Sequence, residues 1–298
     1  MNPTVGLIDS IDIHHCTVSQ HQASGVVVSG AMFRFDIHHN SFIFNGNQPG
    51  STDIGNFFLL GNGQLHNNYM YGGRGYITRL IVASIGPKIS ETYIYNNIQL
   101  ATSIYGGVDI RGNSSNYNGS AYLTYGNVHI INNTIGNKSA ANKYTNAILV
   151  LYPMTGQVEL KNNLAFTTYQ SQPNDDHILM NFSGDNQPKI SNNRYYDSSQ
   201  ILGAVLADTN HFCELTPESP LTGTGAYSAN ILTDFKDSTR PNPPSIGAQD
   251  IGNLKKIPTK RNLKKMVSLK NMLLIFGGAS LVMLIFLYYK KSKKKPSY

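Results

Sequence analysis

The sequence has no tryptophan and only two cysteines among 298 residues. Two cysteines are too few for a disulfide-stapled scaffold or for a cysteine-rich zinc module. Cys16 and Cys213 lie at opposite ends of a repeat whose coils, stacked at about 4.8 Å each, would hold them about 30 Å apart. That separation is beyond the reach of a disulfide. We therefore expect two free thiols.

Charged residues are also scarce, at 14 % of the chain, and no acidic residue follows Asp250. Twelve of the 24 Lys and Arg residues lie in 255–298, so residues 1–254 carry 12 basic and 17 acidic side chains. The net charge of +7 therefore belongs to the tail. Binding to a phosphate backbone needs a basic face. The acidic body thus excludes a nucleic-acid partner.

Asparagine and glycine are abundant instead, with 32 and 27 residues. Helical and coiled-coil proteins are rich in Ala, Glu, Lys, Leu and Arg, which is not the composition here. Short strands joined by many tight turns fit it better, because Gly and Asn tolerate the backbone angles of turns. The composition predicts an all-β fold.

The only long apolar run is residues 272–289, which contain 18 uncharged residues between Lys-rich flanks. As a helix this run would be about 27 Å long, enough to cross a bilayer if the flanking lysines reach the interface. We expect one C-terminal transmembrane α-helix and a single-pass membrane protein. Lysines lie on both sides, so the positive-inside rule leaves the orientation open. No signal peptide is recognisable at the N-terminus. We expect the body to lie outside a cell or on a virion or cell surface.

A short pattern recurs seven times along the chain. Each copy alternates apolar and polar residues and ends in a pair that is usually Asn-Asn. The copies are centred on Ile13, Ile37, Leu65, Ile94, Ile130, Leu160 and Ile190. Alternation of this kind predicts a short strand with one buried face. The spacings of 24 to 36 residues between copies predict one coil of a solenoid for each.

A second apolar strand is expected in each coil, 12 to 21 residues after the first. Its predicted copies are at 26–28, 57–60, 77, 108–110, 148–151, 178–180 and 204–206. We expect the last Asn of each pair to take the left-handed conformation, with His15 and His39 replacing Asn in the turn. Stacked asparagines from Asn40 to Asn193 would form an amide ladder along the axis. Asp109 and Arg111 are expected to form a surface pair.

The repeat resembles the right-handed parallel β-helix proteins of the pectin-lyase-like superfamily over residues 5–210. A second signature, Ser219-Pro-Leu-Thr-Gly-Thr-Gly225 followed by Arg240-Pro241 and Ser245-Ile-Gly-Ala-Gln249, is similar to the closing segment of many surface β-helix proteins. The resemblance implies a right-handed parallel β-helix solenoid of about seven to eight coils. It also implies that the outward face of the coils binds elongated polysaccharides.

We expect four segments. They are a β-helix with its closing segment at 1–250, a basic linker at 251–271, the transmembrane helix at 272–289 and a basic tail at 290–298. Proteins of this family usually begin with a capping element, whereas this chain opens almost directly inside a coil. We therefore expect either that residues are missing upstream or that a partner covers the N-terminal coil.

Two columns of side chains should point outward from the first strand of each coil. The first outward column contains Asp12, Asp36, Gln64, Tyr93, His129, Glu159 and Lys189, and the second contains His14, His38, His66, Tyr95, Ile131, Lys161 and Ser191. Neighbours in a column should stand about 4.8 Å apart. Our candidate catalytic residues are Asp36, His38, His66 and Tyr95, which supply a base and an acid. Our candidate ligand-binding residues are Tyr93, His129, Glu159 and Lys161.

Several functions remain open. The leading one is binding of polysaccharide, as a surface protein or adhesin. A membrane-tethered lyase or epimerase acting on uronic-acid polymers is the alternative, and a purely structural surface or virion stalk is the third. Glycoside hydrolysis is less favoured, because the pectin-hydrolase motifs are absent. Zinc bound by His14, His38 and His66 would need strained strands, so we expect no metal and no cofactor. The favoured interpretation of these histidines is that they occupy ordinary solvated strand positions.

Overall fold

The computed structural model describes residues 10–251, apart from residues 23, 29–33, 46–54, 74, 83, 86–89, 103–105, 113–121, 124–125, 139–146, 152–155, 169–187, 197–200, 204 and 210–211. The chain divides into two compact units, Met1–Gly252 and Asn253–Tyr298. The second unit lies outside the described residues, and so do the predicted linker, membrane span and tail beyond residue 251. Within the described ranges, no helix is both long enough and apolar enough to pass through a bilayer.

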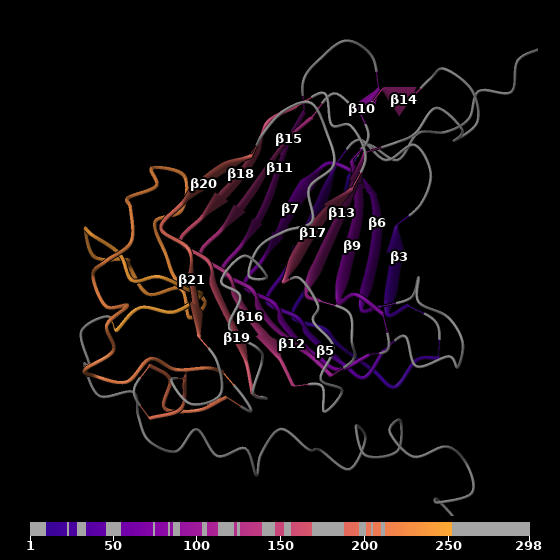
Figure 1. Cartoon of the computed structure of the whole chain (residues 1–298). Coiled ribbons are helices and arrows are strands. Elements are labelled where there is room, and N and C mark those ends of the chain that lie inside the picture. Colours follow the sequence, from indigo (N-terminus) through magenta and orange to yellow (C-terminus); the bar gives the residue numbers. More distant parts are fainter. Residues whose placement is uncertain are drawn as a thin grey trace, which may run out of the picture. The chain divides into compact units, whose positions relative to one another are not determined.

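Three parallel sheets form the body of the first unit (Figure 1). The first sheet contains β1 (Ile11–His14), β4 (Phe35–His38), β7 (Gly63–His66), β11 (Ser90–Tyr95), β15 (Gly126–Ile131), β18 (Val158–Lys161) and β20 (Lys189–Ser191). The second sheet contains β2 (Thr17–Ser19), β5 (Ser41–Ile43), β8 (Tyr69–Tyr71), β12 (Ile98–Ala101), β16 (Thr134–Asn137), β19 (Leu164–Thr167) and β21 (Arg194–Tyr196). The third sheet contains β3 (Val26–Val28), β6 (Phe57–Gly61), β9 (Thr78–Val82), β13 (Val108–Gly112) and β17 (Ile148–Leu151). A short antiparallel pair joins β10 (Ser84–Ile85) to β14 (Tyr122–Leu123).

Each strand of the first sheet pairs with the equivalent strand of the next coil. The seven predicted central residues stand directly opposite one another in this register, from Ile13 opposite Ile37 to Leu160 opposite Ile190. We number the coils 1 to 7 by these strands, from β1 to β20. The predicted repeat is therefore confirmed as seven parallel strands stacked in register in the first sheet. The all-β arrangement is compatible with a parallel β-helix.

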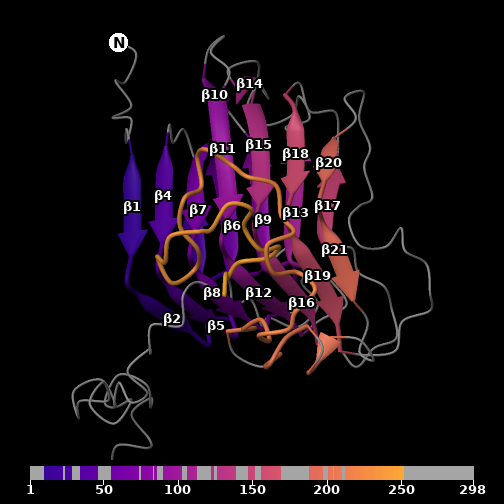
Figure 2. The same ribbon diagram turned by 90° about the vertical axis from the view of Figure 1, so that its left-hand side faces the viewer.

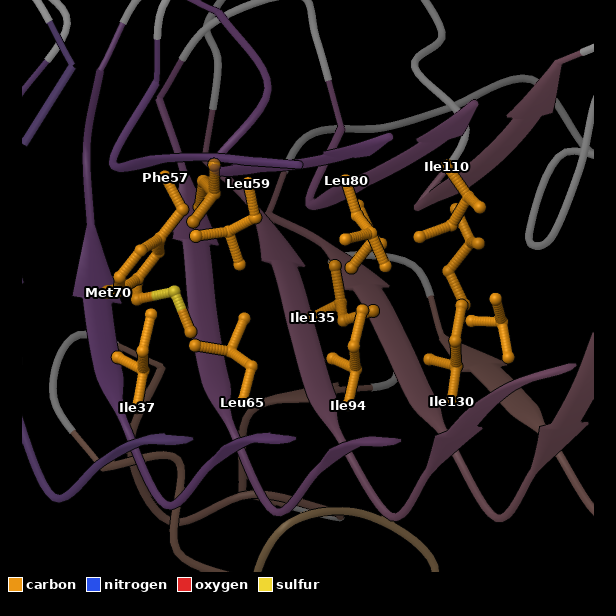
Figure 3. Close-up of a cluster of buried hydrophobic side chains, with 14 of the residues drawn as sticks. Ile37, Phe57, Leu59, Leu65, Met70, Leu80, Ile94, Ile110, Ile130 and Ile135 are labelled. Atoms are coloured by element: carbon orange, nitrogen blue, oxygen red, sulfur yellow. The ribbon is translucent and has the colours of Figure 1, made fainter. Parts of the chain in front are cut away.

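The core lies between the three sheets (Figure 3). Alternate residues of the first sheet, such as Ile37 and Ile94, are fully buried while their neighbours are partly exposed. They face apolar residues of the third sheet, such as Leu59 and Leu80, and Met70 of the second sheet lies among them. Each coil thus buries one short apolar row, and stacking makes the rows continuous. Burial of such side chains contributes about 1.5–3 kcal/mol each.

The predicted second strand corresponds to the third sheet in coils 1 to 5. In coil 3 it is Thr78–Val82, one residue beyond the predicted Ile77. The predicted copy at 178–180 lies outside the described residues. The copy at 204–206 was wrong as a sheet strand, because Leu206 makes only isolated bridges to Leu202 and Leu215. The strands of the second sheet begin directly after each turn, and no residue ranges were predicted for them from the sequence.

The turn between the first and second sheets uses a left-handed residue in every coil. This residue is the first member of the pair and not the last, which corrects the sequence prediction. The residues are His15, His39, Asn67, Asn96, Asn132, Asn162 and Asn192, all with φ between 53° and 55°. We call them the turn column. His15 and His39 replace Asn there, as predicted.

The second member of each pair forms the predicted amide ladder, which is confirmed. The side-chain amide of Asn97 donates to Asn133 Oδ1 at 3.1 Å and to the Leu65 carbonyl at 2.7 Å, while its own oxygen accepts from Asn68. The same pattern joins Asn40, Asn68, Asn97, Asn133, Asn163 and Asn193. At the first coil the ladder ends on the Cys16 backbone, whose N–H donates to Asn40. We call these residues the asparagine ladder.

The ion pair at Asp109 is buried and is not the surface pair that the sequence predicted. Asp109 is fully buried, and its carboxylate accepts hydrogen bonds from Arg79 Nε at 2.6 Å and Arg111 Nε at 3.0 Å. Two guanidinium groups therefore neutralise one buried carboxylate on the outward side of the third sheet. A buried charge without such partners would be strongly destabilising.

Candidate ligand-binding face of the first sheet

The side chains of the second outward column stack ring upon ring in coils 1 to 4. The ring centroids are 5.2 Å apart between His14 and His38, 5.0 Å between His38 and His66, and 4.6 Å between His66 and Tyr95. Successive planes are within 10° of parallel. One face of the Tyr95 ring is therefore covered by His66.

The four candidate catalytic residues are brought together by this stack. Asp36 Oδ1 lies 3.3 Å from His66 Nε2, and the Tyr95 hydroxyl donates to Gln64 Oε1 at 3.1 Å. Burial lowers the pKa of His66 below its ordinary value. Burial, reinforced by the negative charges of Asp36 and Asp237, raises the pKa of Tyr95. The set is compact, and its tyrosine holds its proton firmly.

The residues that follow the last coil return along the ends of the first-sheet strands (Figure 2). We call residues 212–251 the closing segment. Side-chain amides of the turn column donate to its carbonyls, for instance Asn96 to Thr233 at 2.7 Å and Asn162 to Ala226 at 2.8 Å. Further contacts join Asn67 to Asp234, Asn132 to Ser245 and Asn192 to Thr224. The turn column therefore binds the closing segment along five coils.

This segment also occupies part of the predicted face. Lys161 Nζ donates to the Tyr227 carbonyl at 2.7 Å, so that the candidate ligand-binding lysine is engaged within the chain. The side-chain amide of Asn230 donates to the Tyr93 hydroxyl at 3.4 Å. Ile131, which was expected to point outward, is only 3 % exposed. In the second outward column, Ile131 is therefore buried and Lys161 is engaged by the closing segment, while Ser191 stays exposed.

Arg240 holds the closing segment together from within. Its buried guanidinium pairs with Asp250 and donates to Asn96 Oδ1 at 2.8 Å and to the Ala248 carbonyl at 2.9 Å. Asp234 Oδ1 accepts the backbone N–H groups of Lys236 and Ser238, each at 2.9 Å. Burial lowers the pKa of Arg240, opposed by the nearby Asp250 and Asp234 charges. The Arg240–Pro241 signature in the sequence is thus a structural anchor.

The first outward column keeps an accessible polar cluster in coils 4 to 6. His129 Nδ1 lies 2.7 Å from Glu159 Oε2, and His129 Nε2 lies 2.7 Å from Glu91 Oε2. The Tyr93 ring stacks on His129 with centroids 4.6 Å apart. The side chains of Glu91 and Glu159 are 46 % and 28 % exposed. We call Glu91, Tyr93, His129 and Glu159 the acidic cluster.

The chemistry of the acidic cluster follows from its hydrogen bonds. An imidazole that faces a carboxylate at both nitrogens needs an N–H at each for two full hydrogen bonds, and such charge-assisted bonds are strong. The outer carboxylate oxygens remain available as acceptors for hydroxyl groups. Burial, and then the Glu91 charge, raises the pKa of Tyr93, so that its hydroxyl stays a donor. The cluster offers both donors and acceptors at one surface.

Sequence reasoning missed three residues of this face. Glu91 lies two residues before Tyr93 on the same side of β11, so extending the alternation by one step would have found it. Asp237 and Asn230 come from the closing segment, 198 and 137 residues away from their partners His39 and Tyr93. No local pattern points to such distant contacts.

The histidine columns do not enclose a metal ion in the manner considered from the sequence. His14, His38 and His66 meet face to face, so their nitrogen lone pairs do not converge. Across the described part of the chain, no group of three or more His, Cys, Asp or Glu side chains has the arrangement to hold a metal.

No protein-family model, no curated protein and no solved structure matches this chain.

Proposed function

We propose that this chain is a single-pass membrane protein that displays a right-handed parallel β-helix, with a polysaccharide-binding face on the first sheet. The parallel pairing of equivalent strands supports the β-helix, and right-handed crossovers are the rule for parallel strands. The uncharged run at 272–289 supports the anchor. One observation carries the binding function, namely the solvent-accessible acidic cluster across coils 4 to 6.

The acidic cluster suits a hydroxyl-rich polymer. Four hydrogen-bonding side chains lie on adjacent coils about 4.8 Å apart, and a long ligand laid along the axis would meet them in succession. Two carboxylates share one imidazole here, so the local charge is negative in either protonation state of the imidazole. Such a surface favours neutral or amino sugars over uronates, which carry negative charge. The proposed ligand is therefore a polysaccharide without a carboxylate on each unit.

Binding is tested with the full chain in detergent against neutral, amino-sugar and uronic-acid polysaccharides by calorimetry. We expect binding to a neutral or amino-sugar polymer, and a loss of at least about tenfold in Glu159→Gln, which removes a charge-assisted bond. Glu214→Gln is the matched control, because Glu214 pairs with Lys236 on the closing segment and not with the cluster. Equal affinity of Glu159→Gln and the wild-type chain would place any ligand elsewhere.

A lyase or epimerase acting on uronic-acid polymers is the second candidate, favoured by the contact of Asp36 with His66 beneath Tyr95. Proton abstraction beside a carboxylate needs a base and an acid within reach of one carbon. The measurement is the ultraviolet absorbance of unsaturated products with uronate polymers. Turnover that is abolished in Tyr95→Phe while binding is kept would establish this function in place of simple binding.

The anchor is tested by deleting residues 266–298. We expect the truncated protein to leave the membrane fraction, because a single apolar span supplies the whole attachment in this proposal. Circular dichroism should show an unchanged strand content. If the truncated chain stayed with membranes after a high-salt wash, the single-anchor proposal would be wrong. The third candidate, a purely structural stalk, would be left if the chain is anchored yet binds no polysaccharide.

A further inference from the structure

Coils 1 and 2 carry adjacent histidine pairs at the turn where the later coils carry an asparagine. His14 Nδ1 lies 2.9 Å from His15 Nδ1, and His38 Nδ1 lies 2.8 Å from His39 Nδ1. In each pair the planes of the two rings make an angle of 88°. In coil 3 the equivalent pair is His66 and Asn67, and there the imidazole nitrogen meets an amide oxygen at 3.1 Å.

The left-handed backbone is what makes these neighbours meet. Adjacent residues of a regular strand point to opposite faces of the sheet. His15 and His39 both have φ of 55°, which turns the chain and brings the second ring beside the first. A non-glycine residue in this conformation is uncommon and costs energy. Two consecutive coils nevertheless place histidine here, although asparagine is better suited to the conformation.

The far nitrogens of the second pair face carboxylates. His39 Nε2 lies 2.8 Å from Asp237 Oδ2, and His38 Nε2 lies 3.4 Å from Asp12 Oδ1. A carboxylate beside Nε2 favours a hydrogen on that nitrogen, which leaves the lone pair on Nδ1. With both rings in that tautomer, two lone pairs would face each other at 2.8 Å. Two lone pairs that face each other repel, so that a shared proton or a metal ion between them would stabilise this arrangement.

The charges around the pairs also favour a cation. Asp12, Asp36 and Asp237 each lie within 3.4 Å of a histidine Nε2 in this region. Three carboxylates would repel an anionic ligand and strengthen the imidazoles as ligands, as in the carboxylate–histidine–metal arrangement. A shared proton satisfies the pair in the simplest way, and a divalent metal ion satisfies it as well.

We propose that the pairs His14–His15 and His38–His39 each chelate a divalent transition-metal ion of the Cu²⁺ or Ni²⁺ class through their two Nδ1 atoms. At metal–nitrogen distances of about 2.0–2.1 Å, ligands 90° apart have nitrogens about 2.9 Å apart, whereas tetrahedral ligands need about 3.4 Å. The 2.8 and 2.9 Å separations match the right angle of tetragonal sites. Chelation requires both rings to rotate, so that their lone pairs turn away from each other and toward one ion.

Solvent completes the coordination, because the protein supplies two ligands to each ion. This agrees with the finding that the described residues hold no group of three metal-binding side chains. The His38–His39 pair is the stronger site, because Asp237 and Asp12 both orient its rings. His14 and His15 are exposed, and their far nitrogens are less constrained. The two sites should therefore differ in affinity.

The test uses the full chain in detergent, without an added histidine tag, titrated with CuCl₂ by equilibrium dialysis and electron paramagnetic resonance. We expect two ions per chain, with a tetragonal signal split by two nitrogens. His39→Asn recreates the His66–Asn67 arrangement without changing the backbone preference, so it should reduce the count to one ion. His66→Asn is the matched control and should keep both ions.

Asp237→Asn tests the role of the carboxylate behind His39. It keeps both Nδ1 ligands and should weaken the tighter site by about 10- to 100-fold with the same two-nitrogen signal. Copper binding that is unchanged in the double variant His15→Asn/His39→Asn would overturn the proposal. Absence of bound copper in the wild-type chain would also overturn it and leave the shared proton as the occupant of each pair.

Discussion

The two asparagine columns of the turn have the same residue type and stand side by side, yet they serve different partners. The asparagine ladder points inward, where each amide binds the next amide along the axis and a carbonyl of the preceding coil. The turn column points outward, and its amides bind carbonyls of the closing segment. The ladder repeats in every coil from Asn40 onward, whereas the turn column changes to histidine in coils 1 and 2.

The two positions of each turn therefore have different structural roles. Inward-pointing amides are buried and must be satisfied, so replacing one leaves partners unpaired. The turn-column asparagines of coils 3 to 6 are buried as well, and carbonyls of the closing segment satisfy their amides. Where these carbonyls cover the turn, the outward group is an amide. Where Asp237 contacts the turn of coil 2, that group is an imidazole. The turn column therefore changes its residue type with the group that covers it, whereas the ladder keeps asparagine from coil 2 onward.

Removing the anchor of the closing segment should have the largest effect. Arg240→Met leaves Asp250 buried without its cation and removes the contact with Asn96. Loss of one partner of a buried pair costs about 3–5 kcal/mol. We expect the closing segment to detach and become sensitive to protease, as read by limited proteolysis followed by mass spectrometry. Protection equal to that of the wild-type chain would show that the turn column alone holds the segment.

Breaking the asparagine ladder should come next. Asn97→Leu removes the bonds to Leu65 and Asn133 and leaves Asn68 without its acceptor, which should reduce the free energy of unfolding by about 3 kcal/mol. Urea unfolding monitored by circular dichroism measures this. A midpoint equal to that of the wild-type chain would show that the ladder is not needed for stability.

Substitutions in the turn column should reduce stability less. A pair of variants can separate the loss of side-chain hydrogen bonds from backbone strain. Asn132→Gly keeps the left-handed backbone and loses the side-chain bonds to Ser245, Gly247 and Asn162, whereas Asn132→Ala loses the same bonds and also adds strain. Left-handed backbone costs a residue such as alanine about 1 kcal/mol. We expect Ala to be less stable than Gly by about that amount in thermal unfolding. If the two variants were equally stable, backbone strain would not matter at this turn.

The two cysteines should differ in reactivity without any change in stability. Cys213 is buried in the closing segment, and burial raises the pKa of its thiol. Cys16 is exposed in the turn of coil 1. Because the thiolate is the reactive form, iodoacetamide at pH 8 should label Cys16 and leave Cys213 unmodified until the protein is unfolded. Combined with Arg240→Met, labelling of Cys213 would report detachment of the segment.

The parallel coils could be predicted because their signal is local and repeated. Each copy carries its own alternation, and seven copies fix the register. The left-handed position was wrong because two adjacent asparagines look alike in sequence. Coils 1 and 2 held the missing signal, since His15 and His39 occupy the first place of the pair. Histidine fits a turn position, whereas the second place in coil 2 is Asn40, a member of the buried ladder.

The site was harder to predict, because part of it depends on distant residues. The columns from Asp36 to Glu159 follow directly from the strand register, and the structure places them as predicted. The covering of Lys161 by Tyr227 depends on a segment 66 residues further along the chain. The burial of Asp109 depends on Arg79, a full coil earlier and on a different strand. Such contacts join residues that are far apart in the sequence and do not repeat from coil to coil, so no local sequence pattern predicts them.

The path of the closing segment sets the length of the whole solenoid. Between Thr224 and Asp237 the chain contacts the turns of coils 7, 6, 4, 3 and 2 in that order, while Ser245 contacts the turn of coil 5. Its contacts are spaced for the present number of coils. A duplicated repeat inserted between coils 5 and 6 would move Asn162 about 4.8 Å further from Asn132. Repeat proteins usually gain or lose whole repeats. Here the closing segment contacts successive coils, so the number of repeats and the length of this segment must change together.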